Sequence, residues 1–110
     1  MKLPNGEKAS IDERKVREYL LSASHPVGRF KARFFASIGF GQENWQALTE
    51  AIAHVAANGE AQLVQDNENG RKYLVLGVLS GTQARSAEVV SVWIIGVGSD
   101  TPRLVTVYPR

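Results

Sequence analysis

The sequence predicts an α+β fold in which N-terminal helices pack on one face of a roughly four-stranded antiparallel sheet. Two observations predict it. In the first half of the chain, apolar residues recur at the spacing of an amphipathic helix. In the second half, β-branched and aromatic residues form short runs about ten positions apart, separated by short turn-forming segments. Turns of this length join antiparallel strands, because parallel strands need longer crossover connections.

The composition is that of an ordinary globular domain, and residues 1–110 are expected to form a single domain. Apolar residues make up 44% of the chain and charged residues 22%, so a packed core is expected. The absence of cysteine excludes disulfide bonds, thiolate metal sites and a cysteine nucleophile. No apolar run has the length of a secretion signal or a membrane span, and a cytoplasmic location is expected.

Three helices are expected in the first half. Ser10 is a good N-cap and Glu13 follows it at the spacing of a capping box, which predicts the start of the first helix. Gly39 should end the second helix in a left-handed conformation. An apolar stripe that begins at Trp45 and continues to Val55 predicts the third helix. The expected ranges are about 11–21, 28–38 and 43–57.

Four strands are expected in the second half. Asn69 and Gly70 form the strongest hairpin signal of the chain, between the first two strands. The third strand is the most β-branched, and Trp93 near its middle should be buried on the face that the helices cover. The expected ranges are about 62–65, 72–79, 87–97 and 104–108.

His25 is one candidate for chemistry. Histidine exchanges a proton near neutral pH, which suits it for general acid or base catalysis. A histidine in the loop before the second helix can equally serve to cap that helix. His54 lies on an otherwise plain helix and is expected to be a surface residue. Two histidines 29 positions apart, without suitably spaced carboxylates, do not predict a metal site.

The second helix combines basic and aromatic residues. Arg29 and Arg33 are four positions apart, share one helical face, and form a candidate pair for binding an anion. Lys31 lies roughly opposite them. Phe30 and Phe34 have the same spacing and are expected in the core. An ordinary solvated basic face is the alternative for the two arginines.

The last strand places Thr106 and Tyr108 on one face, with Arg103 near its start. Their hydroxyls can hydrogen-bond a phosphate or a transition-state oxyanion. Ordinary strand propensity explains the same residues equally well. Gly96 and Gly98 follow a strand but lead into a turn, so they do not form a nucleotide-binding fingerprint. No cofactor is therefore expected.

Motifs over most of the chain carry a resemblance to a known family. They are Tyr19-Leu20-Leu21, His25-Pro26-x-Gly28-x-x-Lys31-Ala32-x-Phe34-Phe35, Gly39-Phe40, Lys72-Tyr73, Trp93-Ile94-Ile95 and Pro102-Arg103-Leu104-Val105-Thr106-x-Tyr108-Pro109. In this order they resemble domain-of-unknown-function family 6883, a family of small uncharacterised bacterial domains. Its members occur alone and as the last domain of larger secreted or phage-associated bacterial proteins, a placement that is similar to that of toxin domains.

The resemblance implies a toxin-like small domain. The predicted order of elements is also similar to the barnase, EndoU, colicin and RelE group of ribonucleases, which by analogy implies metal-independent cleavage of RNA. No second histidine or glutamate is placed for a barnase-type acid–base pair. A neutralising antitoxin or immunity protein is the expected partner. The implied catalytic residues are His25, Lys31 and Thr106, and the implied substrate-binding residues are Arg29, Arg33, Arg103 and Tyr108.

Two other functions fit the same residues. One is a non-catalytic module that binds a protein or a nucleic acid through the basic helix and the last strand, with His25 in a structural role. The other is an enzyme that acts on NAD or another anionic nucleotide. Replacement of His25 distinguishes a binding module from a ribonuclease. Thermal stabilisation by a nucleotide would identify an enzyme that acts on NAD or another nucleotide.

Overall fold

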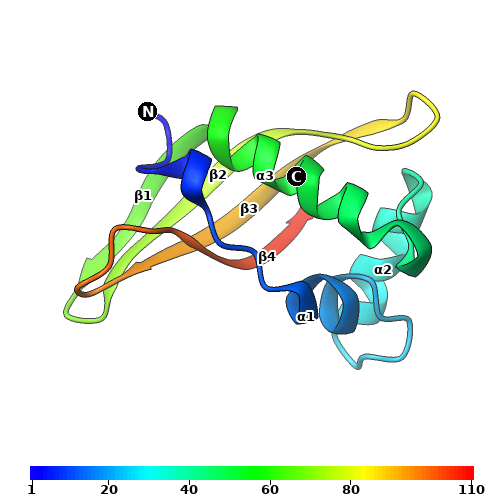
Figure 1. The fold of residues 1–110 in the computed structure, drawn as a ribbon, viewed down its shortest axis with the longest axis horizontal. Helices are drawn as coiled ribbons and strands as arrows, with labels where there is room; N and C mark the ends of the chain where they lie inside the picture. Colours follow the sequence, from blue (N-terminus) through cyan, green and yellow to red (C-terminus); the bar gives the residue numbers. More distant parts are fainter.

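The computed structural model describes residues 1–110 and confirms the predicted α+β class. Three α-helices precede an antiparallel sheet with the strand order β1-β2-β3-β4. Helix α3 lies across one face of the sheet, and α1 and α2 lie together at one end of it (Figure 1). No helix is long and apolar enough to cross a membrane. The elements are α1 (Glu13–Lys15), α2 (Gly28–Ser37), α3 (Trp45–Asn58), β1 (Glu60–Asn67), β2 (Gly70–Ser80), β3 (Ser86–Gly96) and β4 (Arg103–Pro109).

The first helix begins later than predicted. Its cap is Asp12, whose side chain accepts a hydrogen bond of 2.8 Å from the backbone N–H of Arg14. The capping box predicted at Ser10 is wrong, because Ser10 uses its backbone groups to extend the sheet along the edge of β4, where it bridges to Arg103. A π-helical segment, η2 (Val16–Leu20), continues α1 and turns its apolar side chains into the core.

The core lies between the helices and one face of the sheet. Trp93 is fully buried there, as predicted, and its indole N–H donates a hydrogen bond of 2.8 Å to the hydroxyl of Ser91. That hydroxyl donates in turn to the carbonyl oxygen of Val75, 3.1 Å away. The largest fully buried side chains around Trp93 are Phe35, Leu20, Leu48, Ile52, Leu79 and Ile95.

The other face of the sheet, here called the outer face, carries the two hydroxyl residues of β4. The register pairs Thr106 with Val92 and Tyr108 with Val90. These two valines alternate with the core residues of β3 and lie outside the core cluster. Thr106 and Tyr108 therefore share one face of the strand, as its alternation predicts.

Helix α2 turns one of its three phenylalanines toward solvent. Phe35 is buried, Phe34 packs half-buried against the core, and Phe30 is 59% exposed. The core position predicted for Phe30 is wrong. Gly28 and Phe35 are seven positions apart and mark the buried line of the helix, and Phe30 projects from roughly the opposite side.

Candidate functional site

Helix α2 carries three basic residues and no acidic one. None of Arg29, Lys31 and Arg33 belongs to an ion pair, since the four ion pairs of the chain lie at the two termini and within the α1–η2 segment. Cations without acidic partners create a positive potential over this surface, which favours anionic ligands. Arg29 and Arg33 are both exposed, which fits each of the two interpretations that the sequence left open, an anion-binding pair and a solvated basic face.

Lys31 connects α2 to the edge strand β4. Its Nζ lies 5.7 Å from the centre of the Tyr108 ring, within the range of a cation–π contact. Thr106 precedes Tyr108 on the same face, and Arg103 pairs with Ile94 at the start of the same strand, where it is exposed. The structure thus brings Lys31 to Tyr108, and Thr106 lies two residues before Tyr108 on the same face of the strand.

The hydroxyl of Thr106 is unusual at this place. Its Oγ1 is shielded from solvent and has no hydrogen-bond partner. A buried hydroxyl without a partner loses its hydrogen bonds to water and gains none in return, which destabilises the folded state. In the present arrangement of side chains, a ligand in solution does not reach this oxygen.

His25 lies at the entrance to α2, where its ring has a structural role. Its Nδ1 accepts hydrogen bonds from the backbone N–H groups of Val27 at 3.0 Å and Gly28 at 2.9 Å. Its ring stands edge-on to Tyr19, with 5.1 Å between the ring centres. These contacts place His25 beside η2, and none of them reaches β4. Because Nδ1 accepts, the neutral ring carries its proton on Nε2, which remains available to a ligand.

The position of α2 depends on a close approach at Gly28. A Cβ atom on this residue would lie 2.0 Å from the carbonyl oxygen of Tyr19 in η2. Only glycine lets the two backbones come this near, so the first turn of α2 is held against η2. The cations that follow in the same helix are thereby placed relative to η2.

A groove runs along the arginine side of α2. Arg29 and Arg33 stand on one wall, and the volume is about 330 Å³. The groove combines two unpaired cations with small and apolar side chains, so it can receive an anionic group attached to an apolar one. The other lining residues are Leu21, Ala23, Ala32, Ala36, Phe40 and Gly41.

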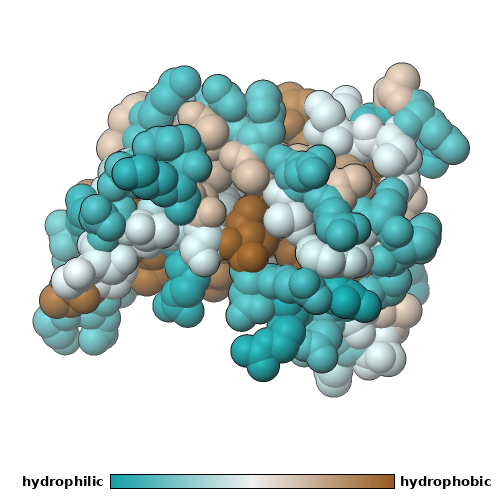
Figure 2. Space-filling view, in the orientation of Figure 1, coloured by the Kyte–Doolittle hydropathy of each residue, from teal (hydrophilic) through white to brown (hydrophobic).

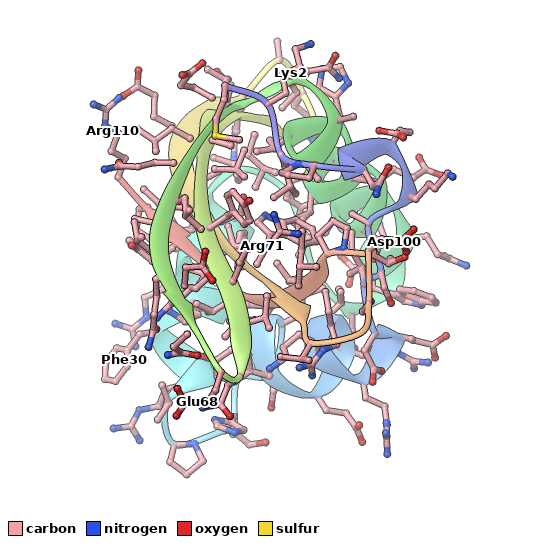
Figure 3. All side chains as sticks on the ribbon, turned by 90° about the vertical axis from the view of Figure 1, so that its left-hand side faces the viewer. Lys2, Phe30, Glu68, Arg71, Asp100 and Arg110 are labelled. Atoms are coloured by element: carbon pink, nitrogen blue, oxygen red, sulfur yellow. The ribbon has the colours of Figure 1, made fainter.

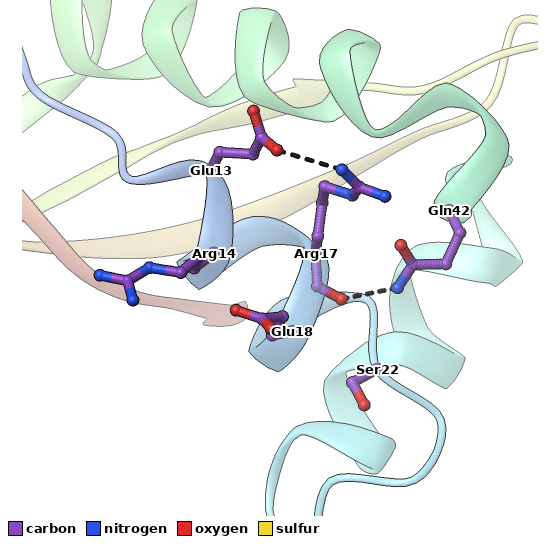
Figure 4. A pocket seen from close by; sticks show the side chains of 6 residues that line it. All are labelled: Glu13, Arg14, Arg17, Glu18, Ser22 and Gln42. Carbon is purple, nitrogen blue, oxygen red and sulfur yellow. Dashed lines mark hydrogen bonds and ion pairs between the residues drawn. The ribbon is translucent and has the colours of Figure 1, made fainter.

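A second hollow, of about 450 Å³, lies over the α1–η2 segment (Figure 4). Two acidic and two basic side chains line it, and Arg17 donates to Glu13 at 3.0 Å. The side chain of Gln42 donates to the carbonyl oxygen of Arg17. Balanced charges of both signs do not favour a phosphate, so this hollow is a weaker candidate for an anionic substrate. The lining residues are Glu13, Arg14, Arg17, Glu18, Ser22 and Gln42.

With this geometry in place, the known proteins can be compared. The model of the family described as a domain of unknown function (DUF6883) matches residues 2–110. The chain belongs to this family. The match spans nearly the whole sequence and confirms the resemblance that the motifs indicated. No curated protein matches the chain.

One solved structure shares the fold. It is described as a contact-dependent growth inhibition toxin–immunity protein complex from Klebsiella pneumoniae 342. The matching chain of that complex aligns with a TM-score of 0.70 and 15% sequence identity, over 96% of each chain. At this identity the similarity establishes a common fold for the whole of this member of family 6883.

Proposed function

We propose that this member of family 6883 is a toxin-type endoribonuclease that works without a metal ion. The observation that carries the proposal is the unpaired basic helix α2, whose Lys31 lies against Tyr108 on the same strand face as Thr106. Support for a toxin comes from the family and from the fold shared with a chain of a toxin–immunity complex.

The chemistry needs a proton donor, a proton acceptor and fixed positive charge. The ribose 2′-oxygen attacks the adjacent phosphorus and loses its proton, while the bond from phosphorus to the 5′-oxygen breaks and that oxygen gains a proton. The products are a 2′,3′-cyclic phosphate and a free 5′-hydroxyl. To act, His25 must release the two backbone N–H groups bound to its Nδ1 and carry its ring proton on Nδ1, so that Nε2 takes the proton of the 2′-oxygen and passes it to the 5′-oxygen. Lys31 and Arg103 stabilise the charge on the phosphate. Arg29 and Arg33 hold the flanking backbone, and Tyr108 hydrogen-bonds the scissile group. Thr106 joins Tyr108 in this role if the binding of RNA exposes its hydroxyl.

The partner in this proposal is an immunity protein or antitoxin with an acidic surface. Such a surface would neutralise the three unpaired cations of α2 and exclude RNA from the same place. Support comes from the toxin–immunity protein complex of which one chain shares this fold.

The test is cleavage of total bacterial RNA by the purified protein in excess chelator. We expect new 2′,3′-cyclic phosphate ends, and a growth defect when the chain is expressed in bacteria. Lys31→Gln should lower the cleavage rate about 100-fold or more, as the loss of one transition-state contact typically does. Lys2→Gln removes an exposed lysine outside the site and should leave the rate unchanged. Intact RNA and normal growth would refute a ribonuclease.

A non-catalytic binding module is the second candidate. It is favoured by the structural use of the His25 ring and by the shielded hydroxyl of Thr106. In this case the basic helix binds a partner, and replacement of His25 leaves the affinity for that partner and any effect on growth nearly unchanged. The effect of His25→Asn on growth therefore separates the two functions, because a ribonuclease loses its toxicity with this change and a binding module keeps its effect.

A further inference from the structure

We infer that Phe30 is a stacking platform for an unpaired base of single-stranded RNA, an inference that rests on the proposed function and names its substrate more closely. Phe30 exposes 59% of its surface at the crest of α2 and projects away from the body of the molecule (Figure 3). Among the aromatic side chains of the chain, it is the one that is exposed. Single exposed apolar side chains are common at protein surfaces, so the inference rests on the unpaired cations that surround this ring.

The surroundings of Phe30 match the chemistry of a nucleotide. The guanidinium carbon of Arg29 lies over the Phe30 ring, 4.9 Å from its centre, while the side chain remains 59% exposed. A base on the face opposite Arg29 would complete a stack of arginine, phenylalanine and base. Arg33 follows on the groove side of the helix and Lys31 on the sheet side, so cations flank the ring in both directions for the phosphates.

The exposed ring of Phe30 is explained better by an RNA base than by the apolar core of a protein interface. The exposed apolar part of this surface consists of Phe30 and Val27, which is 57% exposed. A stable protein interface buries about 800 Å² on each side around a core depleted in charge. Two apolar side chains among three unpaired cations do not supply such a core. An unpaired base needs one ring face and one phosphate contact, which this surface offers.

The experiment measures binding of a fluorescently labelled 2′-O-methyl RNA of ten nucleotides, which cannot be cleaved through its 2′-oxygen. Phe30→Ala should weaken binding at least about 5-fold, and Phe30→Leu should weaken it similarly, because leucine keeps apolar bulk and lacks a π-face. Phe30→Trp should retain the affinity, and its added indole emission should be quenched when RNA binds. Val97→Ala, at a 72% exposed apolar residue of the β3–β4 turn, is the matched control and should bind as the unaltered protein does.

The contribution of the charged side chains to RNA binding is measured separately, by the dependence of affinity on salt concentration. Arg29→Gln should reduce the slope of log affinity against log salt concentration by about one, whereas Phe30→Ala should leave that slope nearly unchanged. This separates the phosphate contacts from the stack.

The outcomes distinguish this inference from the proposed function. If the uncleavable RNA binds and its affinity depends on the Phe30 ring, stacking of a base on Phe30 is supported. If total RNA stays intact in the same preparation, the ribonuclease is refuted. Cleavage of total RNA together with equal affinity of Phe30→Leu and the unaltered protein would refute the stack and leave the ribonuclease standing. No binding of RNA by the unaltered protein, or a Phe30 dependence seen only with a protein partner, would also overturn the inference.

Discussion

The Nδ1 atom of His25 accepts a hydrogen bond from the backbone N–H of Gly28, 2.9 Å away, at the start of α2. The same atom accepts from Val27 at 3.0 Å. The first N–H groups of a helix have no partner within the helix, so one imidazole satisfies two donors that the backbone leaves free. His25 thus serves as the cap, one of the two roles that the sequence left open. The proposed role in proton exchange requires an unprotonated Nε2, so the cap would have to open during the reaction.

The two roles of His25 can be separated by substitution. The Oδ1 of asparagine occupies nearly the position of the histidine Nδ1, but asparagine has no ring nitrogen that exchanges protons. His25→Ala should lower the free energy of unfolding by about 0.5–2 kcal/mol through loss of the cap, and His25→Asn should lower it by less. Both should abolish RNA cleavage. Urea unfolding and cleavage assays on the same preparations measure the two effects, and cleavage retained by His25→Asn would leave His25 with a structural role alone.

The close approach of Gly28 to Tyr19 predicts a strong penalty for one added methyl group. Gly28→Ala would place its Cβ 2.0 Å from a backbone oxygen, and a backbone cannot move aside as a flexible side chain does. We expect a loss of about 1–3 kcal/mol of stability, the usual result of overpacking, and displacement of α2 from η2. Gly96→Ala is the matched control, since nothing lies within 4 Å of its added Cβ. Equal midpoints of thermal unfolding for the two variants would contradict the prediction.

The hydrogen bond between Trp93 and Ser91 predicts an energetic coupling in the core. Ser91→Ala leaves the buried indole N–H without an acceptor and should cost about 1–3 kcal/mol. Trp93→Phe removes the donor, so the double variant should be more stable than the sum of the single losses predicts. Ser86→Ala, at an exposed serine of the same strand, is the control and should change stability by less than about 0.5 kcal/mol. Denaturant unfolding of all four variants tests this, and strictly additive losses would contradict it.

The fold could be predicted because the hydrophobic period changes once, at mid-chain, and the turns are short. The predicted ends of the strands were less accurate where strand pairing depends on backbone hydrogen bonds alone. Strand β1 was expected over 62–65 and runs over Glu60–Asn67, because its backbone pairs with β2 from Glu60 opposite Leu76 to Asn67 opposite Gly70. Polar side chains at a sheet edge do not prevent such pairing, so hydropathy cannot mark the ends of an edge strand.

The candidate site was harder to predict from the sequence than the fold. Equal spacing made Phe30 and Phe34 look like one core pair, but the buried line of α2 is fixed by Gly28 against η2 and by Phe35 in the core. The glycine at 28 was the available signal, since a helical glycine near an aromatic residue indicates a close backbone approach. The meeting of Lys31 with Tyr108 joins segments 77 positions apart and depends on the packing of α2 at the edge of β4.

The last prediction concerns the hydroxyl of Thr106, which has no hydrogen-bond partner although its oxygen is shielded from solvent. Thr106→Val replaces this hydroxyl by a methyl group of similar shape and removes the desolvation penalty, so the variant should be more stable by about 1 kcal/mol. If the Thr106 hydroxyl binds a phosphate once RNA is present, Thr106→Val should also lower the rate of RNA cleavage. Such a gain of stability with a loss of activity is common at functional sites. Thermal unfolding and cleavage by Thr106→Val measure both, with Thr101→Val at a turn outside the site as the control. A more stable variant with an unchanged cleavage rate would remove Thr106 from the catalytic group and leave Lys31, Tyr108 and His25 to carry the reaction.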